Sequence, residues 1–219
     1  MLISGAFGLF RRSDLIEMGG YRHDTVGEDL ELVTHIHRHM REKKRPYRIA
    51  FVPDIVCWTE APASLQGLAN QRARWQQGAL ETLSFHRRMI GNPRYGRIGM
   101  LALPQMILED LLGPPAELIG YVLIPLAVLL GILDPMAALV FFFVSVVFGC
   151  GLSVGTLALE EHQLRRTPTA KDLLRIGWAA IVENFGYRQL NLWYRLKGVK
   201  RYLKSDSTWA AVPREGFNA

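Results

Sequence analysis

Two long apolar runs, separated by a short turn, most constrain what this chain can fold into. Residues about 116–133 and about 136–159 carry almost no charge beyond Glu117 at the edge of the first run, and Asp134-Pro135 lies between them. Each run is near the length of about 20 residues that an α-helix needs to cross a bilayer. A buried helical pair in a soluble protein is the alternative. Runs this long and uncharged favour a transmembrane hairpin.

The charges around the two runs predict their orientation. The segment from Glu160 to Arg175 is polar and basic, and so is the tail from Arg195 to Lys204. Short loops rich in Lys and Arg stay in the cytoplasm, so the Asp134-Pro135 turn is expected outside and the C-terminus inside. That arrangement requires an even number of crossings. Two spans satisfy it, and four would if residues 98–112 also cross.

Two further apolar segments are less regular. Residues 98–112 contain Pro104, Glu109 and Asp110 and are expected to stop at Gly113-Pro114-Pro115, as an interfacial or broken helix. Residues 173–196 begin apolar and then become polar within one helix length. Charged groups inside a membrane usually face a polar path or protein. The second segment is therefore either a third span or an interfacial helix.

Composition excludes other classes of protein. Hydrophobic residues make up 49% of the chain, while 26 Lys and Arg outnumber 20 Asp and Glu. The basic residues cluster beside apolar runs without a helix-turn-helix or zinc-finger pattern, so we expect no nucleic-acid partner. Cys57 and Cys150 are too few for a disulfide framework or a metal cluster.

A helix expected from about Ser64 to Arg88 carries the pentad Gln71-Arg72-Ala73-Arg74-Trp75. Gln71, Arg74 and Trp75 are spaced i, i+3, i+4 and so share one face of that helix. A guanidinium grips phosphate and an indole offers a flat stacking surface, which together suit an anionic ligand that contains a ring. The alternative is a membrane-surface helix with a snorkelling Arg and an interfacial Trp.

An acidic pair, Glu28-Asp29, follows Gly27 and opens a helix expected from Glu28 to Glu42. Carboxylates are also what a helix N-terminus favours, so a purely structural role is the alternative. His35 and His39 lie one turn apart, as two metal ligands would, and His37 lies between them. No third ligand falls at a zinc-enzyme spacing, and a solvated basic face is the preferred interpretation.

The rest of the N-terminal part predicts short elements. Residues 2–10 are expected to form a buried strand and loop, and Ser13 or Asp14 to cap a short helix that ends at Gly19-Gly20. Tyr47 to Val52 and Ile55 to Thr59 are expected to be strands.

Four motifs in this order resemble the processive, membrane-embedded family 2 glycosyltransferases, the relatives of cellulose, chitin, hyaluronan and poly-N-acetylglucosamine synthases. They are the segment from Ser4 to Arg12, the Gly19-Gly20-Tyr21 turn, Glu28-Asp29 and the pentad; Trp58-Thr59-Glu60 lies between the last two, and Trp209 and Arg214 fit the family's tail. The resemblance covers only the second half of such an enzyme.

The resemblance implies an α/β fold with membrane helices: the C-terminal part of a GT-A-like glycosyltransferase domain, followed by interfacial and transmembrane helices. The expected divisions are the catalytic portion (1–63), interfacial helices with the pentad (64–113), the transmembrane hairpin (114–159), and a basic loop, third apolar or interfacial helix and cytoplasmic tail (160–219).

The resemblance also implies the chemistry and the site. A sugar would pass with inversion from a nucleotide diphosphate to a growing polysaccharide or glycolipid, at the cytoplasmic face of the inner membrane. Asp29 would be the general base with Glu28 orienting it, and the substrate-binding residues would be Gln71, Arg72, Arg74, Trp75 and Gly5. For Gly5, which would leave room for the acceptor sugar, a tight turn is the alternative.

Enzymes of this kind also have a nucleotide-binding half with an Asp-x-Asp site for Mg²⁺ or Mn²⁺. The 26 residues before Gly27 are too few for that half. We therefore expect this chain to bind no cofactor alone and to need a partner half, within a longer enzyme or on a separate subunit. The alternatives are a non-catalytic membrane subunit or anchor of a synthase, and a polysaccharide-conducting module in which the pentad is only an interfacial anchor.

Overall fold

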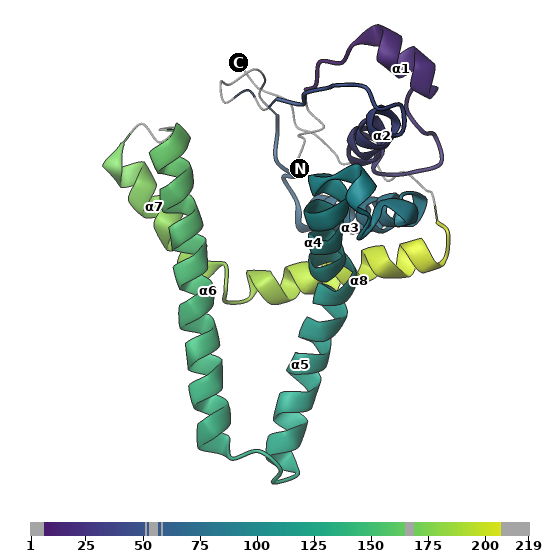
Figure 1. Cartoon of the computed structure of the whole chain (residues 1–219). Helices are drawn as coiled ribbons and strands as arrows, with labels where there is room; N and C mark the ends of the chain where they lie inside the picture. The colour runs from purple at the N-terminus through teal and green to yellow at the C-terminus, as the bar shows by residue number, and fades with distance from the viewer. Residues whose placement is uncertain (1–6, 51, 53–56, 58, 165–168, 207–219) are drawn as a thin grey trace. The chain divides into compact units, whose positions relative to one another are not determined.

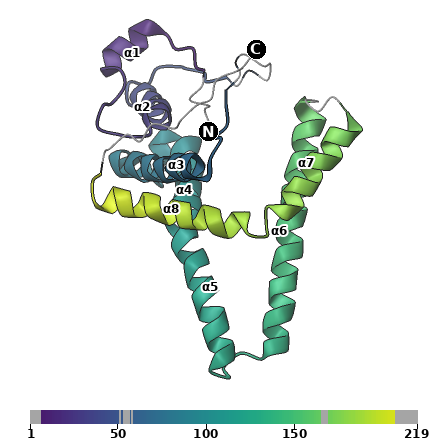
Figure 2. The same cartoon turned by 180° about the vertical axis from the view of Figure 1, so that it is seen from behind.

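The computed structural model describes residues 7–50, 52, 57, 59–164 and 169–206, which form two compact units. The described parts of residues 1–115 and 194–219 make the first unit, and residues 116–193 make the second. Within the first unit, Figures 1 and 2 both show helix α2 (Glu28–Glu42) beside helix α3 (Leu65–Phe85).

The first helix, α1, spans Arg12–Met18. The prediction that Ser13 or Asp14 caps it is wrong, because both residues lie inside its first turn and Arg11 occupies the N-cap position without a side-chain hydrogen bond. Its predicted end is confirmed. Gly19 has a φ of 86°, in the left-handed region; its N–H bonds to the carbonyl of Ile16, and the N–H of Gly20 bonds to the carbonyl of Leu15.

Helices α2 and α3 match their sequence patterns closely. Helix α2 begins at Glu28 and ends at Glu42, as predicted, and buries Leu32, Val33 and Met40. Helix α3 begins after Ser64, whose Oγ accepts a hydrogen bond of 3.1 Å from the N–H of Gly67. This N-cap satisfies one of the N–H groups that lack an intrahelical partner.

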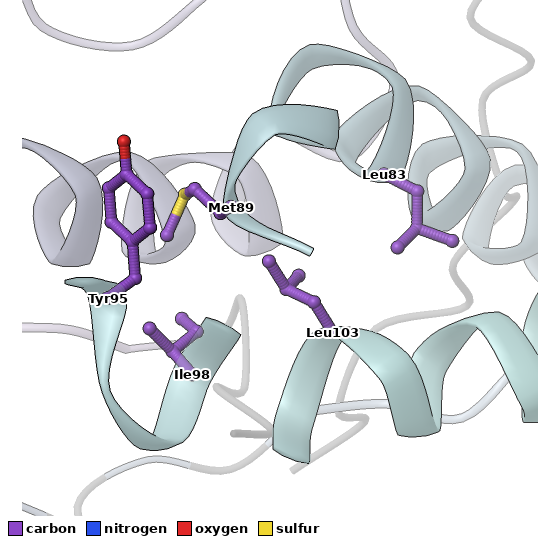
Figure 3. Packing of buried hydrophobic residues seen from close by; sticks show 5 residues of the cluster. All are labelled: Leu83, Met89, Tyr95, Ile98 and Leu103. Atoms are coloured by element: carbon purple, nitrogen blue, oxygen red, sulfur yellow. The ribbon is translucent and has the colours of Figure 1, made fainter. Parts of the chain in front are cut away.

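The apolar core of the first unit joins the end of α3 to the segment that follows it. The core contains Leu83, Met89, Tyr95, Ile98 and Leu103, which Figure 3 shows in close packing. Met89 and Leu103 are fully buried. Burying a side chain of this size contributes about 1.5–3 kcal/mol relative to leaving it exposed. Short 3₁₀ turns at Arg87–Met89 and Pro93–Tyr95 carry the chain between these positions.

The predicted strands are not observed. Residues 47–50 and 52 have no regular secondary structure, and no strand occurs within the described residues. Most of the other two predicted strands, at 2–10 and 55–59, lies outside the described residues. A strand is stable only when a neighbouring strand pairs with its backbone, and residues 47–50 have none in the described part of the chain. The α/β class is therefore not confirmed.

One helical run continues from Ile98 to Leu129. It consists of a π-helical segment (Ile98–Ala102), α4 (Leu103–Met106), a second π-helical segment (Ile107–Leu112) and α5 (Gly113–Leu129). The predicted stop at Gly113-Pro114-Pro115 is wrong. Both prolines lie in the first turn of α5, where the fixed φ of proline fits the helix.

The second unit contains α6 (Pro135–Leu164), α7 (Ala170–Val182) and the start of α8 (Tyr187–Leu203). The helical segments Ile98–Leu129 and Pro135–Leu159 are long and apolar enough to cross a membrane. Ile98 and Leu103 belong to the buried core of the first unit, but most of the other large apolar side chains of these segments are exposed, with Phe143 at 67%. Water would solvate such a surface poorly, so the two segments fit a lipid environment.

The segment 173–196, expected to be one helix, is divided between α7 and α8. Residues 183–186 form turns, and Gly186 adopts a φ of 83°, which ends the α-helical path. Thr169 caps α7 by accepting a hydrogen bond from the N–H of Asp172. The apolar side chains of α7 and the polar ones that follow therefore belong to separate helices.

Candidate functional site

The acidic pair lies in the first turn of α2. Glu28 is exposed and Asp29 is half-buried. One carboxylate oxygen of Asp29 accepts a hydrogen bond of 2.8 Å from the N–H of Leu30. Asp29 is thus held as a partly exposed hydrogen-bond acceptor.

The start of α2 lies directly against the backbone of α3 at two glycines. A Cβ built on Gly27 would be 2.8 Å from the Cα of Gly78, and a Cβ built on Gly78 would be 2.7 Å from the Cα of Gly27. Side-chain carbons do not approach backbone atoms that closely, so only glycine fits at both positions. The acidic pair is therefore anchored immediately beside Gly78.

A carboxylate on α3 fixes the same junction with hydrogen bonds. Glu81 Oε2 accepts from the Thr25 hydroxyl at 2.7 Å and from the N–H of Val26 at 2.9 Å. Its other oxygen accepts from the side-chain amide of Gln77 at 2.8 Å. Hydrogen bonds to a charged acceptor contribute about 1.5–3 kcal/mol each. Glu81 thus ties the segment before the acidic pair to α3.

Three pentad residues share the face of α3 that carries Gly78. Gln71, Arg74, Trp75 and Gly78 are spaced i, i+3, i+4 and i+7 within the helix. Neighbours on such a face are about 5–6 Å apart. Arg74 and Trp75 therefore lie about one helical turn along α3 from Gly78, against which Gly27 packs. Gly27 precedes Glu28-Asp29, so the Gly27–Gly78 contact joins the segment of the acidic pair to the helix that carries the pentad.

Trp75 presents an open ring at this site. Its side chain is 52% exposed, and the guanidinium carbon of Arg72 lies 4.7 Å from the ring centroid. A cation over the indole contributes about 0.5–1 kcal/mol at an exposed site. Arg72 does not lie on the shared face. Its guanidinium contacts the ring of Trp75, which does. Gly5 and Trp58 lie outside the described residues.

Replacing Gly78 by Ala is expected to separate the acidic pair from α3. The added Cβ would meet the backbone of Gly27, which cannot move aside as a flexible side chain would. Overpacking of this kind destabilises by about 1–3 kcal/mol, and thermal unfolding in detergent measures it. Gly177→Ala in α7 is the matched control, because nothing lies within 4 Å of its new Cβ. An unchanged unfolding temperature for Gly78→Ala would contradict the close contact.

Sequence reasoning missed Gly78 and Glu81. A signal for Gly78 was present, because glycine inside a helix costs about 1 kcal/mol relative to Ala and so marks a close backbone approach. Glu81 carries no such local signal. Its partners, Thr25 and Val26, lie 56 and 55 residues away along the chain.

The three histidines of α2 turn to different partners. His35 lies 3.9 Å from the buried Glu31, whose carboxylate contacts His86 at 3.1 Å. His37 contacts the Tyr47 hydroxyl at 2.6 Å, and burial lowers its pKa to about 4. His39 lies 3.4 Å from Glu17. Within the described residues, no group of three or more His, Cys, Asp or Glu side chains is arranged to hold a metal ion.

Comparison with known proteins identifies relatives of the segment that builds this site. A family model described as "Glycosyl transferase family group 2" matches residues 1–154. Poly-beta-1,6-N-acetyl-D-glucosamine synthase of Staphylococcus aureus (strain COL) is 38% identical over 81 residues, which are 37% of this chain and 18% of the relative. The enzyme of that name from Staphylococcus epidermidis is 36% identical over the same length. The chain thus aligns with less than a fifth of each relative. No solved structure matches significantly.

Proposed function

Because this chain belongs to glycosyl transferase family group 2, we propose that it forms the acceptor side of a membrane-bound polysaccharide or glycolipid synthase. The reaction moves a sugar from a nucleotide diphosphate to an acceptor hydroxyl, with inversion at the anomeric carbon. The observation that supports this proposal is the Gly27–Gly78 contact, which places the residue before the acidic pair against the face of α3 that carries Arg74 and Trp75.

Asp29 is assigned the general base in this proposal. The acceptor hydroxyl must lose its proton as it attacks the anomeric carbon, and a positioned carboxylate can take it. Asp29 has a suitable place, since it is half-buried in the first turn of α2. Glu28, which is exposed beside it, orients the acceptor or Asp29.

In this proposal the pentad stabilises the leaving diphosphate and binds the sugar or nucleotide ring. Negative charge develops on the diphosphate as the glycosidic bond to it breaks, and fixed cations stabilise that charge. Arg74 supplies a forked guanidinium, with Arg72 beside the ring of Trp75. The exposed indole of Trp75 packs against a ring of the substrate, and Gln71 donates hydrogen bonds from the same face.

The divalent cation that the family resemblance implies does not fit the described residues, since they offer no cluster of metal ligands. We assign Mg²⁺ or Mn²⁺ to a nucleotide-binding half, in the same or a separate polypeptide. The basic segments after α6 support a cytoplasmic position for this site, on the side where nucleotide sugars are made. Two membrane crossings are proposed.

The similarity to two poly-beta-1,6-N-acetyl-D-glucosamine synthases supports UDP-N-acetylglucosamine as the first donor to test. Membranes from cells that express the chain together with its nucleotide-binding half would be incubated with labelled UDP-N-acetylglucosamine, and UDP-glucose would be the comparison. We expect label in a polymer that a β-hexosaminidase degrades. If labelling is the same in membranes from cells that lack this chain, the chain takes no part in the transfer and the proposal fails.

A further inference from the structure

Two adjacent prolines at the start of α5 remove hydrogen-bond donors from the preceding turn. In an α-helix the carbonyl of residue 110 accepts from the N–H of residue 114, and in a π-helix it accepts from residue 115. Both are prolines in this chain, so neither has an N–H to donate. The carbonyl of Glu109 likewise loses its π-helical donor at Pro114. Unpaired carbonyls in apolar surroundings are strongly disfavoured.

Side chains from two other helices bond to these two carbonyls. The Gln76 side-chain amide of α3 donates to the carbonyl of Asp110, and a terminal nitrogen of Arg195 on α8 donates to the carbonyl of Glu109. The same Arg195 nitrogen also contacts the Asp110 carboxylate at 3.1 Å. Arg195 Nε also donates a hydrogen bond of 2.7 Å to Gln76 Oε1, so the two side chains are bonded to each other as well. All four residues belong to the first unit.

Helix α8 is placed closely enough on α3 for this contact. A Cβ built on Gly198 would be 2.4 Å from the carbonyl oxygen of Ala73 and 2.7 Å from the Cβ of Gln76. Gly198 is one helical turn from Arg195, on the same side of α8. Glycine therefore lets the two backbones approach, and this approach brings the Arg195 guanidinium to Gln76.

Gln76 lies on the opposite side of α3 from the face that carries Gln71, Arg74 and Trp75. It is only 3% exposed and continues the buried row of Ala69 and Ala73, whereas the neighbouring Trp75 is 52% exposed. A hydrogen bond that fixes Gln76 also fixes the rotation of α3 about its axis. That rotation sets the directions in which Arg74 and Trp75 point.

We propose that Gln76 and Arg195 are positioning residues. Their hydrogen bonds to each other and to the carbonyls of Glu109 and Asp110, called the lock below, hold α3 in one orientation and so set the directions of Arg74 and Trp75. This inference rests on the proposed function for its effect on catalysis, but the lock itself follows from the contacts. A misplacement of about 1 Å at a catalytic site can lower the rate by about 100-fold. Loss of the lock therefore lowers kcat more than it raises KM.

The test uses a proline rescue in the complete membrane-bound enzyme. Arg195→Met is expected to lower kcat by about 10- to 100-fold, with KM for the nucleotide sugar changed by less than about threefold. Adding Pro114→Ala and Pro115→Ala restores backbone N–H donors to the two carbonyls, and should recover at least several-fold of kcat. Arg195→Lys should fall between, because an ammonium cannot reproduce the guanidinium fork. Arg201→Met is the matched control on α8, since Arg201 reaches Asn70 and not these carbonyls.

Hydrogen exchange of the same variants separates this inference from the proposed function. Arg195→Met should speed amide exchange in residues 71–80, and the added alanines should slow it again. Wild-type kcat in Arg195→Met alongside an inactive Asp29→Asn would overturn the positioning role. Failure of the alanines to restore either kcat or exchange would overturn it as well. Full activity of Asp29→Asn would contradict the proposed catalytic function. Amide hydrogen exchange in residues 71–80 would then be the only test of whether the lock exists.

Discussion

Asp29→Asn is expected to reduce sugar transfer by about 10²- to 10⁴-fold, the range that general-base catalysis contributes. Asparagine keeps the size and the acceptor oxygen that bonds to the N–H of Leu30, so α2 should still begin at the same place. It cannot accept a proton from the attacking hydroxyl. The loss should appear in kcat, with KM for the nucleotide sugar nearly unchanged, because the proton moves only in the transition state.

Two other carboxylates provide controls for the Asp29 result. Asp24→Asn removes an exposed carboxylate that pairs with Arg22 at 2.6 Å in the loop before α2, and it should leave transfer within about twofold. Glu28→Gln removes the other member of the acidic pair and should have a smaller effect than Asp29→Asn. The measurement is labelled polymer formed per membrane-inserted protein. Transfer by Asp29→Asn within twofold of the wild type would show that another group is the base.

Local sequence patterns were sufficient to predict the helices that build the site. Helix α2 begins at Glu28 and ends at Glu42, as expected, and α3 begins after Ser64, close to its expected start. Both features depend on residues within a few positions of one another. Propensity and capping act on that scale, so sequence reasoning finds them.

The long-range contacts of the site could not be predicted in this way. The sequence placed the acidic pair and the pentad on separate helices, but their junction depends on Gly27 meeting Gly78 and on Glu81 reaching Thr25. Nothing near any of these residues specifies its partner. The resemblance to a family predicted that the two motifs act together. The contact between Gly27 and Gly78, which joins their two helices, could be found only from the structure.

The expected break at Gly113-Pro114-Pro115 was wrong for a related reason. Proline ends a helix when it removes a hydrogen bond that nothing replaces, and the replacements here come from Gln76 and Arg195, far away in sequence. Local chemistry shows only that both prolines lack an N–H donor. It could not identify the side chains that bond to the exposed carbonyls and let the helical run continue to Leu129.

The other large expected effect concerns the pentad, where Arg74→Lys tests a phosphate site against a membrane anchor. Lysine keeps the charge and the amphipathic character of α3 but loses the planar fork that binds two oxygens at once. If Arg74 stabilises the leaving diphosphate, the loss of one charge-assisted hydrogen bond, about 1.5–3 kcal/mol, should lower kcat/KM by roughly 10- to 150-fold. Arg87→Lys, an exposed position beyond the end of α3, should leave kcat/KM unchanged.

Trp75→Ala should weaken substrate binding at the same site, because the exposed indole of Trp75 is the surface assigned to a substrate ring. Losing an aromatic pair removes about 0.5–1.5 kcal/mol beyond the buried area, so KM for the nucleotide sugar or the acceptor should rise several-fold. Trp75→Phe should keep part of the effect, since a smaller ring can still stack. Both variants should stay in the membrane fraction at wild-type levels, because the helices Ile98–Leu129 and Pro135–Leu159 are unchanged. If Arg74→Lys and Trp75→Phe keep full transfer while Trp75→Ala only loosens membrane association, the pentad is an interfacial anchor and the diphosphate is stabilised elsewhere.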